Sequence, residues 1–475
     1  MNKHIIFFIL ICCLSQILWS QPANNRFRDE GFSLKVDDND NVYISGYTKS
    51  LGNGNRNAYI AKFDNSGNFI KEVFWGKNET DEFRDIILKD NNIYATGISY
   101  WRGGNSIEMI FALYNSELEL QWITNFGGLA WQYGYFIETL SNGSILFGGM
   151  DRECGLGRPL IVKTNDVGDV YWVKNMGECS SLYPVDVMES TSGNLTFLCS
   201  LGGFFNYGTL WSSASIHDAD ILLLNTDFDG NVLHIDTIGG NQHDIPVKLE
   251  YVTPDKSLLL AHSQSWTENK NFDICLFFLN GDNTIDDVKT FGGNSFEYAA
   301  DMDIDADGNI HIIGTNASYT QHPVIYYLKL DQQGNIIDEK YLLTEIKGYG
   351  ASIEVKDTSI YILANLFPED DFGKMVLMKN FEPCDTFDSE NIQPIVEIYP
   401  NPVSGQCRID TYGMFDDDNN IKINIYGIKG TLVKTFTYYG NYNVMDLSDV
   451  ASGHYIVVIN GDKRRITKKI IVKNE

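Results

Sequence analysis

Aromatic side chains are the residues of this 475-residue chain whose type and placement best suit ligand binding. They gather in long segments between predicted strands, where a rigid scaffold usually carries its binding residues. Flat aromatic rings suit the faces of sugars or a peptide backbone. The candidate binding residues are Tyr100, Trp101, Trp131, Tyr133, Phe204, Tyr207, Trp211, Trp266 and Tyr319. The alternative is that these rings pack against neighbouring parts of the scaffold or plug its centre.

Acids recur at one position after glycines. Asp81, Asp244 and Glu297 each follow the first glycine of a junction by five residues, and Glu30 is in register with them. Such a set could hold Ca²⁺, a hard cation that binds carboxylate oxygens. Calcium is therefore the one cofactor that the sequence suggests. The alternative is that these acids cap turns or face solvent.

One passage recurs seven times and predicts the fold. A polar turn is followed by a short apolar strand that stops at Gly46, Gly97, Gly149, Cys199, His262, Gly314 or Ala364. The intervals are 51, 52, 50, 63, 52 and 50 residues. A unit of this length that is built only from strands is typical of a β-propeller blade. We therefore predict an all-β chain with a seven-bladed β-propeller over residues 21–382.

Each repeat divides into four predicted strands, which in the second repeat cover 85–90, 93–97, 108–114 and 120–128. The turns between the third and fourth strands begin with Asp or Asn and carry a Gly suited to positive φ; examples are 63–68, 164–169, 226–231 and 330–335. In this strand order, the loops between second and third strands and the junctions between blades lie on one side of the propeller, which we call the top face. The candidate aromatic residues lie in top-face segments. An insertion at 202–218 accounts for the longest interval.

The repeat resembles a known family. The repeat contains D-x-D-G-N, an apolar strand ending in Gly, a strand, D-x-x-G-N, a strand and F-G-G-N, in that order. This succession is similar to the bacterial SBBP β-propeller repeat. The unit from Phe291 to Asn335 fits best, whereas the units ending at Cys199 and His262 lack the terminal glycine. The resemblance implies a propeller at the cell surface and no particular activity.

The last repeat has no clear fourth strand. Residues 22–28 precede the first strand of the first repeat and could supply it. We therefore expect this segment to complete the seventh blade and remove an exposed sheet edge.

Linear catalytic motifs are missing from the sequence. It contains no G-x-S-x-G, H-E-x-x-H or P-loop. Asp303, Asp305 and Asp307 resemble an EF-hand start, but its twelfth position is Gly314, so we expect a hairpin turn. Arginine is scarce in the propeller after residue 30, where it occurs at Arg56, Arg84, Arg102, Arg152 and Arg158. A carboxylate pair leaves no linear trace, so a carbohydrate-active hydrolase or lyase stays the alternative function.

The N-terminus predicts export. Lys3 and His4 precede an apolar stretch from Ile5 to Leu14, which is typical of a signal peptide covering residues 1–20. A lipoprotein signal ending at Cys12 or Cys13 is the alternative. No other apolar run reaches membrane-spanning length, so we expect no transmembrane segment in the mature chain.

Charge and cysteine content limit the partners and crosslinks. The net charge of −27 argues against nucleic acid as a partner, because phosphate binding needs clustered Lys and Arg. Export permits disulfides. Cys154 and Cys179, in two loops of one repeat, either form one or are both free.

After a linker at 383–394, residues 395–475 form a small predicted β-sandwich. The phrases that identify it are Tyr399-Pro400-Asn401-Pro402, N-I-Y-G-x-x-G with Gly427 and Gly430, and L-x-x-x-x-S-G-x-Y with Gly453 and Tyr455. They resemble the type A C-terminal sorting domain of the type IX secretion system of Bacteroidetes. The resemblance implies the type IX secretion machinery as a partner, and release or attachment at the outer surface. A permanent immunoglobulin-like module is the alternative.

These features together predict a secreted or cell-surface binding protein. Its propeller top face is expected to bind a glycan or another outer-envelope protein.

Overall fold

The computed structural model is built from β-strands. It describes residues 29–51, 55–76, 80–101, 106–128, 130–177, 180–202, 219–253, 255–267, 271–320, 322–368, 373–383, 395–412, 420–428, 430–439, 442–460 and 465–473. These residues form strands β1 to β35 and contain no helix. Nowhere in these ranges is there a helix that could span a membrane. Strands β1 to β28 belong to one compact unit and β29 to β35 to another.

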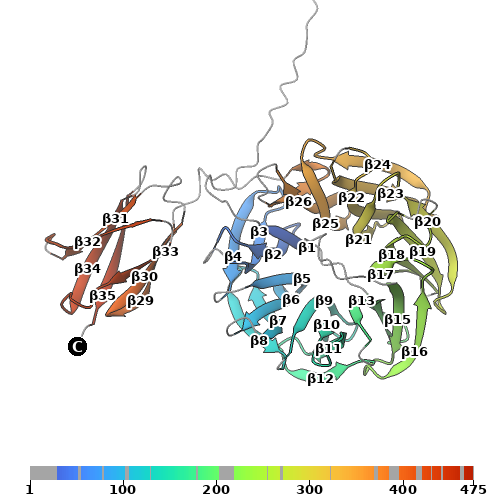
Figure 1. Cartoon of the computed structure of the whole chain (residues 1–475), viewed down its shortest axis with the longest axis horizontal. Helices are drawn as coiled ribbons and strands as arrows, with labels where there is room; N and C mark the ends of the chain where they lie inside the picture. The colour runs from blue at the N-terminus through green and yellow to red at the C-terminus, as the bar shows by residue number, and fades with distance from the viewer. Residues whose placement is uncertain are drawn as a thin grey trace, which may run out of the picture. The chain divides into compact units, whose positions relative to one another are not determined.

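Seven antiparallel four-stranded sheets surround a common centre, as predicted (Figure 1). The innermost strands, which we call the hub strands, are β1 (Glu30–Val36), β5 (Asp81–Lys89), β9 (Gln132–Thr139), β13 (Leu182–Glu189), β17 (Asp244–Thr253), β21 (Glu297–Ile304) and β25 (Lys347–Lys356). The second strands are β2 (Val42–Thr48), β6 (Asn92–Trp101), β10 (Ile145–Asp151), β14 (Leu195–Leu201), β18 (Lys256–Ser263), β22 (Ile310–Asn316) and β26 (Ser359–Phe367). The third strands are β3 (Asn57–Phe63), β7 (Ser106–Asn115), β11 (Arg158–Thr164), β15 (Asp220–Thr226), β19 (Asp273–Asn280), β23 (Val324–Leu330) and β27 (Lys374–Lys379). The outer strands are β4 (Phe69–Trp75), β8 (Leu120–Phe126), β12 (Val170–Asn175), β16 (Val232–Ile238), β20 (Ile285–Phe291), β24 (Ile336–Leu342) and β28 (Glu382–Pro383).

The turns between third and outer strands have the predicted construction. The Asp64 carboxylate accepts hydrogen bonds from the backbone N–H groups of Ser66 and Asn68 at 2.9 and 2.8 Å. Gly67 has a φ of 83°, a conformation that glycine adopts without strain. The same positive φ recurs at Gly168, Gly230 and Gly334. The expected hairpin at Asp305 is also confirmed, since its side chain accepts from Asp307 and Asn309.

The small residue that ends each second-strand motif lies beside a bulge in the hub strand. In the second blade the bulge falls between Phe83 and Asp85, opposite Gly97. A Cβ on Gly97 would lie 1.9 Å from the backbone oxygen of Glu82, so only glycine fits there. In the fifth blade the corresponding residue is Ala261. The prediction that His262 ends the motif was wrong by one residue, because the fifth blade has no glycine that marks this position.

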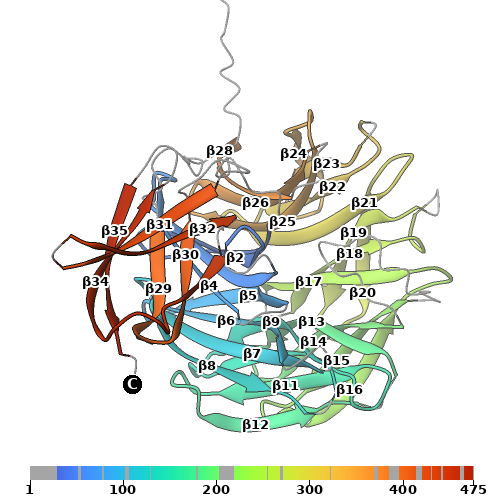
Figure 2. The same cartoon turned by 60° about the vertical axis from the view of Figure 1, so that its left-hand side comes forward.

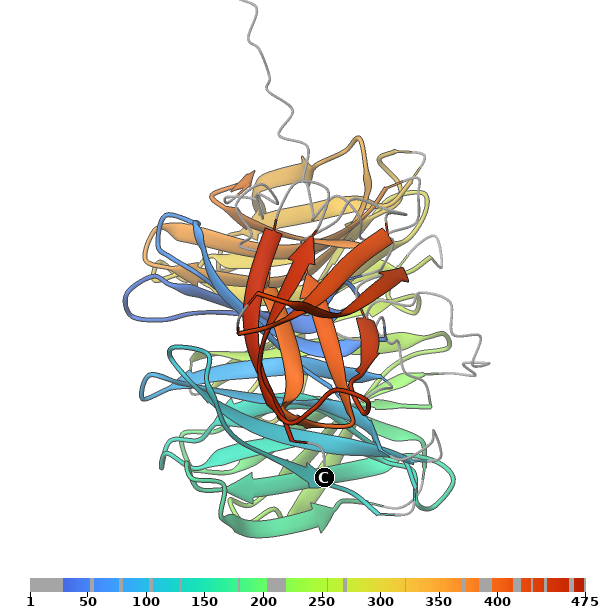
Figure 3. The same cartoon turned by 90° about the vertical axis from the view of Figure 1, so that its left-hand side faces the viewer.

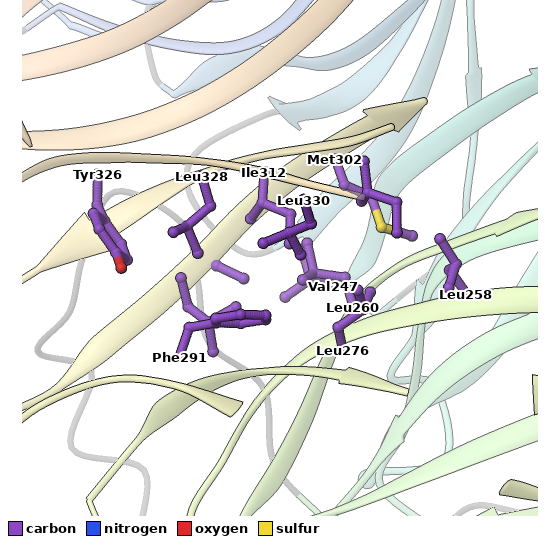
Figure 4. Packing of buried hydrophobic residues seen from close by; sticks show 13 residues of the cluster. Val247, Leu258, Leu260, Leu276, Phe291, Met302, Ile312, Tyr326, Leu328 and Leu330 are labelled. Atoms are coloured by element: carbon purple, nitrogen blue, oxygen red, sulfur yellow. The ribbon is translucent and has the colours of Figure 1, made fainter. Parts of the chain in front are cut away.

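Apolar side chains between neighbouring sheets form the core of the propeller. Leu260 and Leu276 of the fifth blade pack in one cluster with Ile312 and Leu328 of the sixth (Figure 4). All four are fully buried. Burial of such a side chain is worth roughly 1.5–3 kcal/mol. The blades are therefore held together chiefly by apolar contact, and such clusters recur between other neighbouring sheets. Figure 2 shows these sheets side by side around the centre.

The ring closes through polar contacts between the seventh and first blades. The Asn365 side chain accepts a hydrogen bond from the N–H of Gly31 at 2.8 Å and donates one to its carbonyl at 2.9 Å. The seventh blade also has a fourth strand of its own, the two-residue β28. Residues 22–28 lie outside the described ranges, so their predicted role stays a prediction.

The C-terminal unit is drawn in orange to red in Figure 3. Its strands are β29 (Ile395–Ser404), β30 (Gln406–Tyr412), β31 (Asn420–Gly427), β32 (Leu432–Tyr439), β33 (Tyr442–Asp446), β34 (Gly453–Asn460) and β35 (Arg465–Val472). They follow the order β32-β31-β34-β35-β29-β30-β33. Ile409, Ile425 and Val457 are part of its buried core.

The sorting phrases occupy defined places in this unit. The N–H of Gly430, at φ 81°, donates to the carbonyl of Gly427 and closes the turn between β31 and β32. The Tyr455 hydroxyl donates to the carbonyl of Ala451 at 2.6 Å, which ties β34 to the preceding turn. Tyr399, Pro400, Asn401 and Pro402 lie within β29.

Candidate functional site

Arginines gather at the top ends of the first three blades. Arg56 directly precedes β3, Arg84 lies in β5, Arg152 directly follows β10, and Arg158 begins β11. These are all the arginines of the propeller that the structure describes, since Arg102 lies outside the described ranges. The sequence argument treated arginine as scarce and missed that it is concentrated. The signal was present: every propeller arginine after residue 30 falls between positions 56 and 158.

Glu82 holds two of these arginines together. Its Oε1 accepts from Nη1 of Arg56 at 2.5 Å, and its Oε2 accepts from Nη2 of Arg84 at 3.1 Å. The Glu82 side chain is 1% exposed, against 27% for Arg56 and 10% for Arg84. Arg84 is the extra residue of the bulge in β5 and Glu82 lies two residues before it, so the hub strand itself fixes their positions.

Aromatic rings flank three of these arginines. The guanidinium of Arg56 lies 4.4 Å from the ring centre of Tyr47, and that of Arg84 lies 5.2 Å from Tyr135. Tyr133 stacks on Tyr135 with ring centres 5.9 Å apart. Arg152 lies 5.4 Å from the ring centre of Trp131. We call this set the arginine–tyrosine cluster; its members are Tyr47, Arg56, Glu82, Arg84, Trp131, Tyr133, Tyr135 and Arg152.

Burial controls the chemistry of the two hub tyrosines. It raises the pKa of Tyr133 to about 12 and that of Tyr135 further, although the charges of Arg84 and Arg152 partly oppose the rise. Both hydroxyls therefore stay protonated near neutral pH and can donate hydrogen bonds. They are poorly suited to act as general bases.

The predicted aromatic residues fall into three groups. Tyr133 and Trp131 belong to the cluster, and Tyr100 is close enough to influence the pKa of Tyr133. Trp266 packs edge-on against Phe277, and Tyr319 stacks on Tyr341 at 3.9 Å, in the fifth and sixth blades. Phe204, Tyr207, Trp211 and the side chain of Trp101 lie outside what the structure describes.

The three predicted calcium ligands are not brought together. Asp81, Asp244 and Glu297 are at most 1% exposed, each at the start of a different hub strand. Asp244 accepts from the N–H of Gly240, and Glu297 from that of Gly293, both at 2.9 Å. Among the described residues, no three His, Cys, Asp or Glu side chains are arranged to hold a metal ion. Asp244 and Glu297 hold equivalent positions in different blades, and at this position each carboxylate caps the turn at its own blade junction.

A second set of acids was missed by the sequence argument. Nine charged side chains of the hub strands lie below the bulges and act on one another, namely Lys35, Asp85, Glu138, Asp186, Lys248, Glu250, Asp301, Asp303 and Glu354. We call these the hub charges. Each hub strand has one edge without a strand partner, and several hub acids accept hydrogen bonds from N–H groups of the hub strand in the next blade. Asp85 accepts from Ile137 at 3.0 Å, and Asp186 from Leu249 at 2.8 Å.

The hub charges also shift one another's pKa values. The carboxylate of Asp186 is the main cause that raises the pKa of Lys248, so this lysine stays charged. Burial raises the pKa of Glu250 to about 7. The charge of each of these groups therefore depends on its neighbours. Their carboxylates accept hydrogen bonds from backbone N–H groups between blades.

Of the predicted cysteine pair, Cys154 is disulfide-bonded. Cys179 lies outside the described residues, so the pairing stays a prediction. Cys199, Cys275 and Cys407 are free and buried.

No curated protein matches this chain. Residues 397–473 match the family model of the secretion system C-terminal sorting domain. This match shows that the chain carries a type IX sorting tail and is a secreted or cell-surface protein.

Solved structures with propeller domains are similar to the chain at low identity. An ulvan lyase of polysaccharide lyase family PL25 is 12% identical, covers 77% of this chain and 95% of its own, and has a TM-score of 0.49. The β-propeller domain of the trilobed protease of Pyrococcus furiosus is 13% identical, with 76% and 94% covered and a TM-score of 0.39. The GH93 alpha-L-arabinofuranosidase of Fusarium graminearum is 11% identical, with 62% and 90% covered and a TM-score of 0.42. Likeness at this level does not transfer an activity.

Proposed function

We propose that this exported protein binds a glycan through the top face of its propeller, over the arginine–tyrosine cluster. The observation that carries the proposal is the convergence of three arginines, three tyrosines and a tryptophan from three blades. Aromatic faces stack on sugar rings, and guanidinium groups donate to their oxygens. A rigid propeller holds such a set without the cost of ordering loops.

Two features favour binding over catalysis. The one carboxylate inside the cluster, Glu82, is buried and occupied by Arg56 and Arg84. The tyrosine hydroxyls next to it stay protonated because burial raises their pKa values. Neither group is poised to exchange a proton with a substrate, which a hydrolase or lyase requires.

Trp131 gives the cluster an accessible edge, because its side chain is 41% exposed. Trp266 is similarly exposed, at 39%, but belongs to the fifth blade. These two tryptophans therefore form a matched pair for locating the binding surface. We propose that Trp131 contacts the ligand and that Trp266 does not.

The test is a polysaccharide and glycan array probed with the full secreted chain, with reducing-end release measured in parallel. Binding without release supports the proposal, and we expect Trp131→Ala to weaken it about tenfold while Trp266→Ala leaves it unchanged. Release of sugars would show an enzyme instead. No glycan binding, with capture of an envelope protein, would show the alternative partner class.

A further inference from the structure

The glycan proposed above would meet a set of hydrogen-bond donors at the centre of the cluster. Tyr133 and Tyr135 carry protonated hydroxyls, and Arg84 and Arg152 lie near enough to both to lower the pKa values of these phenols against the effect of burial. A guanidinium has five N–H donors and no acceptor. Donors in this arrangement favour a ligand group that only accepts, such as a carboxylate or a sulfate.

The local charge also favours an anionic ligand group. Arg158 is neutralised by Asp151, with Nη2 to Oδ2 at 3.0 Å. Arg56 and Arg84 share Glu82, and Glu30 also acts on Arg56. Among the described residues Arg152 forms no salt bridge, so one positive charge next to Tyr133 is left for a ligand. A locally uncompensated arginine stands out in a chain whose net charge is −27.

The hub charges below the cluster set the direction from which an anion can approach. They comprise seven acids against two lysines, one of which, Lys248, is held by Asp186. Their negative potential disfavours an anion deeper in the hub. A charged ligand group is therefore expected to stay at the top, beside Tyr133 and Arg152.

We infer that the ligand of the arginine–tyrosine cluster is an acidic polysaccharide, whose carboxylate or sulfate group is bound by Arg152 beside the hydroxyls of Tyr133 and Tyr135. This inference rests on the proposed glycan binding. Carboxylate and sulfate both suit the paired N–H groups of arginine, and the sugar rings would lie against the neighbouring aromatic faces.

The experiment compares charged polymers with neutral polymers of the same backbone, using the full secreted chain. Polygalacturonate is paired with its carboxyl-reduced form, and dextran sulfate with dextran. We expect at least one charged polymer to bind about tenfold or more tightly than its neutral partner, because a charge-assisted hydrogen bond is the stronger kind. The two pairs show whether the recognised group is a carboxylate or a sulfate.

Two single-charge variants locate the effect. Arg152→Gln should weaken binding of the charged polymer about tenfold and leave a neutral polymer unaffected. Lys256→Gln is the matched control, because it removes one positive charge from an exposed pair with Asp286 in the fifth blade. Equal loss in both variants would show non-specific attraction and overturn the inference.

The two proposals fail differently. Equal binding of charged and neutral polymers would overturn the acidic class while glycan binding survives. No binding to any polysaccharide, charged or neutral, would overturn the proposed function itself, and the inference with it.

Discussion

Asp273 and Glu297 face each other across the junction of the fifth and sixth blades and share a hydrogen bond between their carboxyl groups. Asp273 is 8% exposed and Glu297 is fully buried. Asp273 Oδ1 and Glu297 Oε1 find no conventional donor among the described residues. Two carboxyl groups bond in this way only when one of them holds a proton. A Cβ on Gly292 would lie 2.2 Å from Cγ of Asp273, so glycine is what admits the acid to this junction.

This pair predicts that the propeller loses stability as the pH rises. Burial, and then the charge of Glu297, raise the pKa of Asp273 to about 7, above the value of about 3.9 in an unfolded chain. The folded state therefore binds the extra proton, and its contribution is full below about pH 4 and lost as the pH passes 7. Each unit of pKa difference corresponds to about 1.4 kcal/mol. We expect the urea concentration at the midpoint of denaturation to decrease as the pH is raised from 5 to 8.

Asp273→Asn should reduce that slope and raise the stability at pH 8, while buried acids such as Glu250, whose pKa is also raised to about 7, keep part of the slope. The chain itself supplies the precedent, because Asn57 and Asp81 occupy the equivalent places at the junction of the first and second blades. Asp286→Asn, at an exposed salt bridge with Lys256, is the control for loss of one acid. An unchanged slope in Asp273→Asn would contradict the shared proton.

The fold was predictable because its signals are local. Asp64 and Gly67 build a turn within six residues, and the same turn with a glycine at positive φ recurs in the third, fourth and sixth blades. Spacing then gives the number of blades. The register failed only at His262, where the small residue of the motif is Ala261 and no glycine marks the place.

The candidate site could not be predicted in the same way. Arg56, Arg84 and Tyr135 come from three blades, and Arg84 and Tyr135 are the extra residues of bulges in their hub strands, which the strand alternation of the sequence does not place. Equal spacing also misled the assignment of Asp81, Asp244 and Glu297 to one calcium site. Residues with the same place in different blades meet only where the strands converge, and Asp244 and Glu297 are each hydrogen-bonded within their own junction.

Closure of the ring gives a second prediction. Asn365 bonds both the N–H and the carbonyl of Gly31, and its side chain is 6% exposed. Asn365→Ala leaves both backbone groups without these partners, which should cost about 2–4 kcal/mol of unfolding free energy. Urea denaturation of the full chain measures it. Thr315→Ala, at the same place in the sixth blade, is the control and should cost clearly less. Equal effects would mean that the Asn365 bonds add nothing to closure.

The hub charges give a third prediction. Asp186 accepts from the N–H of Leu249 and is the main charge that stabilises Lys248 in its charged form. Asp186→Ala removes both interactions and should lower the unfolding free energy by about 3 kcal/mol. Asp186→Asn keeps an acceptor for Leu249 and should cost less than half as much. Equal costs would show that the loss of the Asp186 charge accounts for the whole effect and that the hydrogen bond from Leu249 adds nothing to stability.

The sorting domain gives the last prediction, which concerns export rather than stability. Strands β29 to β35 form their own compact unit with a separate core, so deleting residues 395–475 should leave the propeller folded. We expect the shortened chain to be retained in the cells of its native host and the full chain to appear at the surface or in the medium. Immunoblots of cell, surface and medium fractions measure this, and an unchanged melting temperature of the purified shortened chain shows that it folds. Ile428→Ala, at a side chain that is 74% exposed in the same domain, is the control and should be exported normally. Release of the shortened chain at the level of the full one would contradict the role of this domain as the export signal.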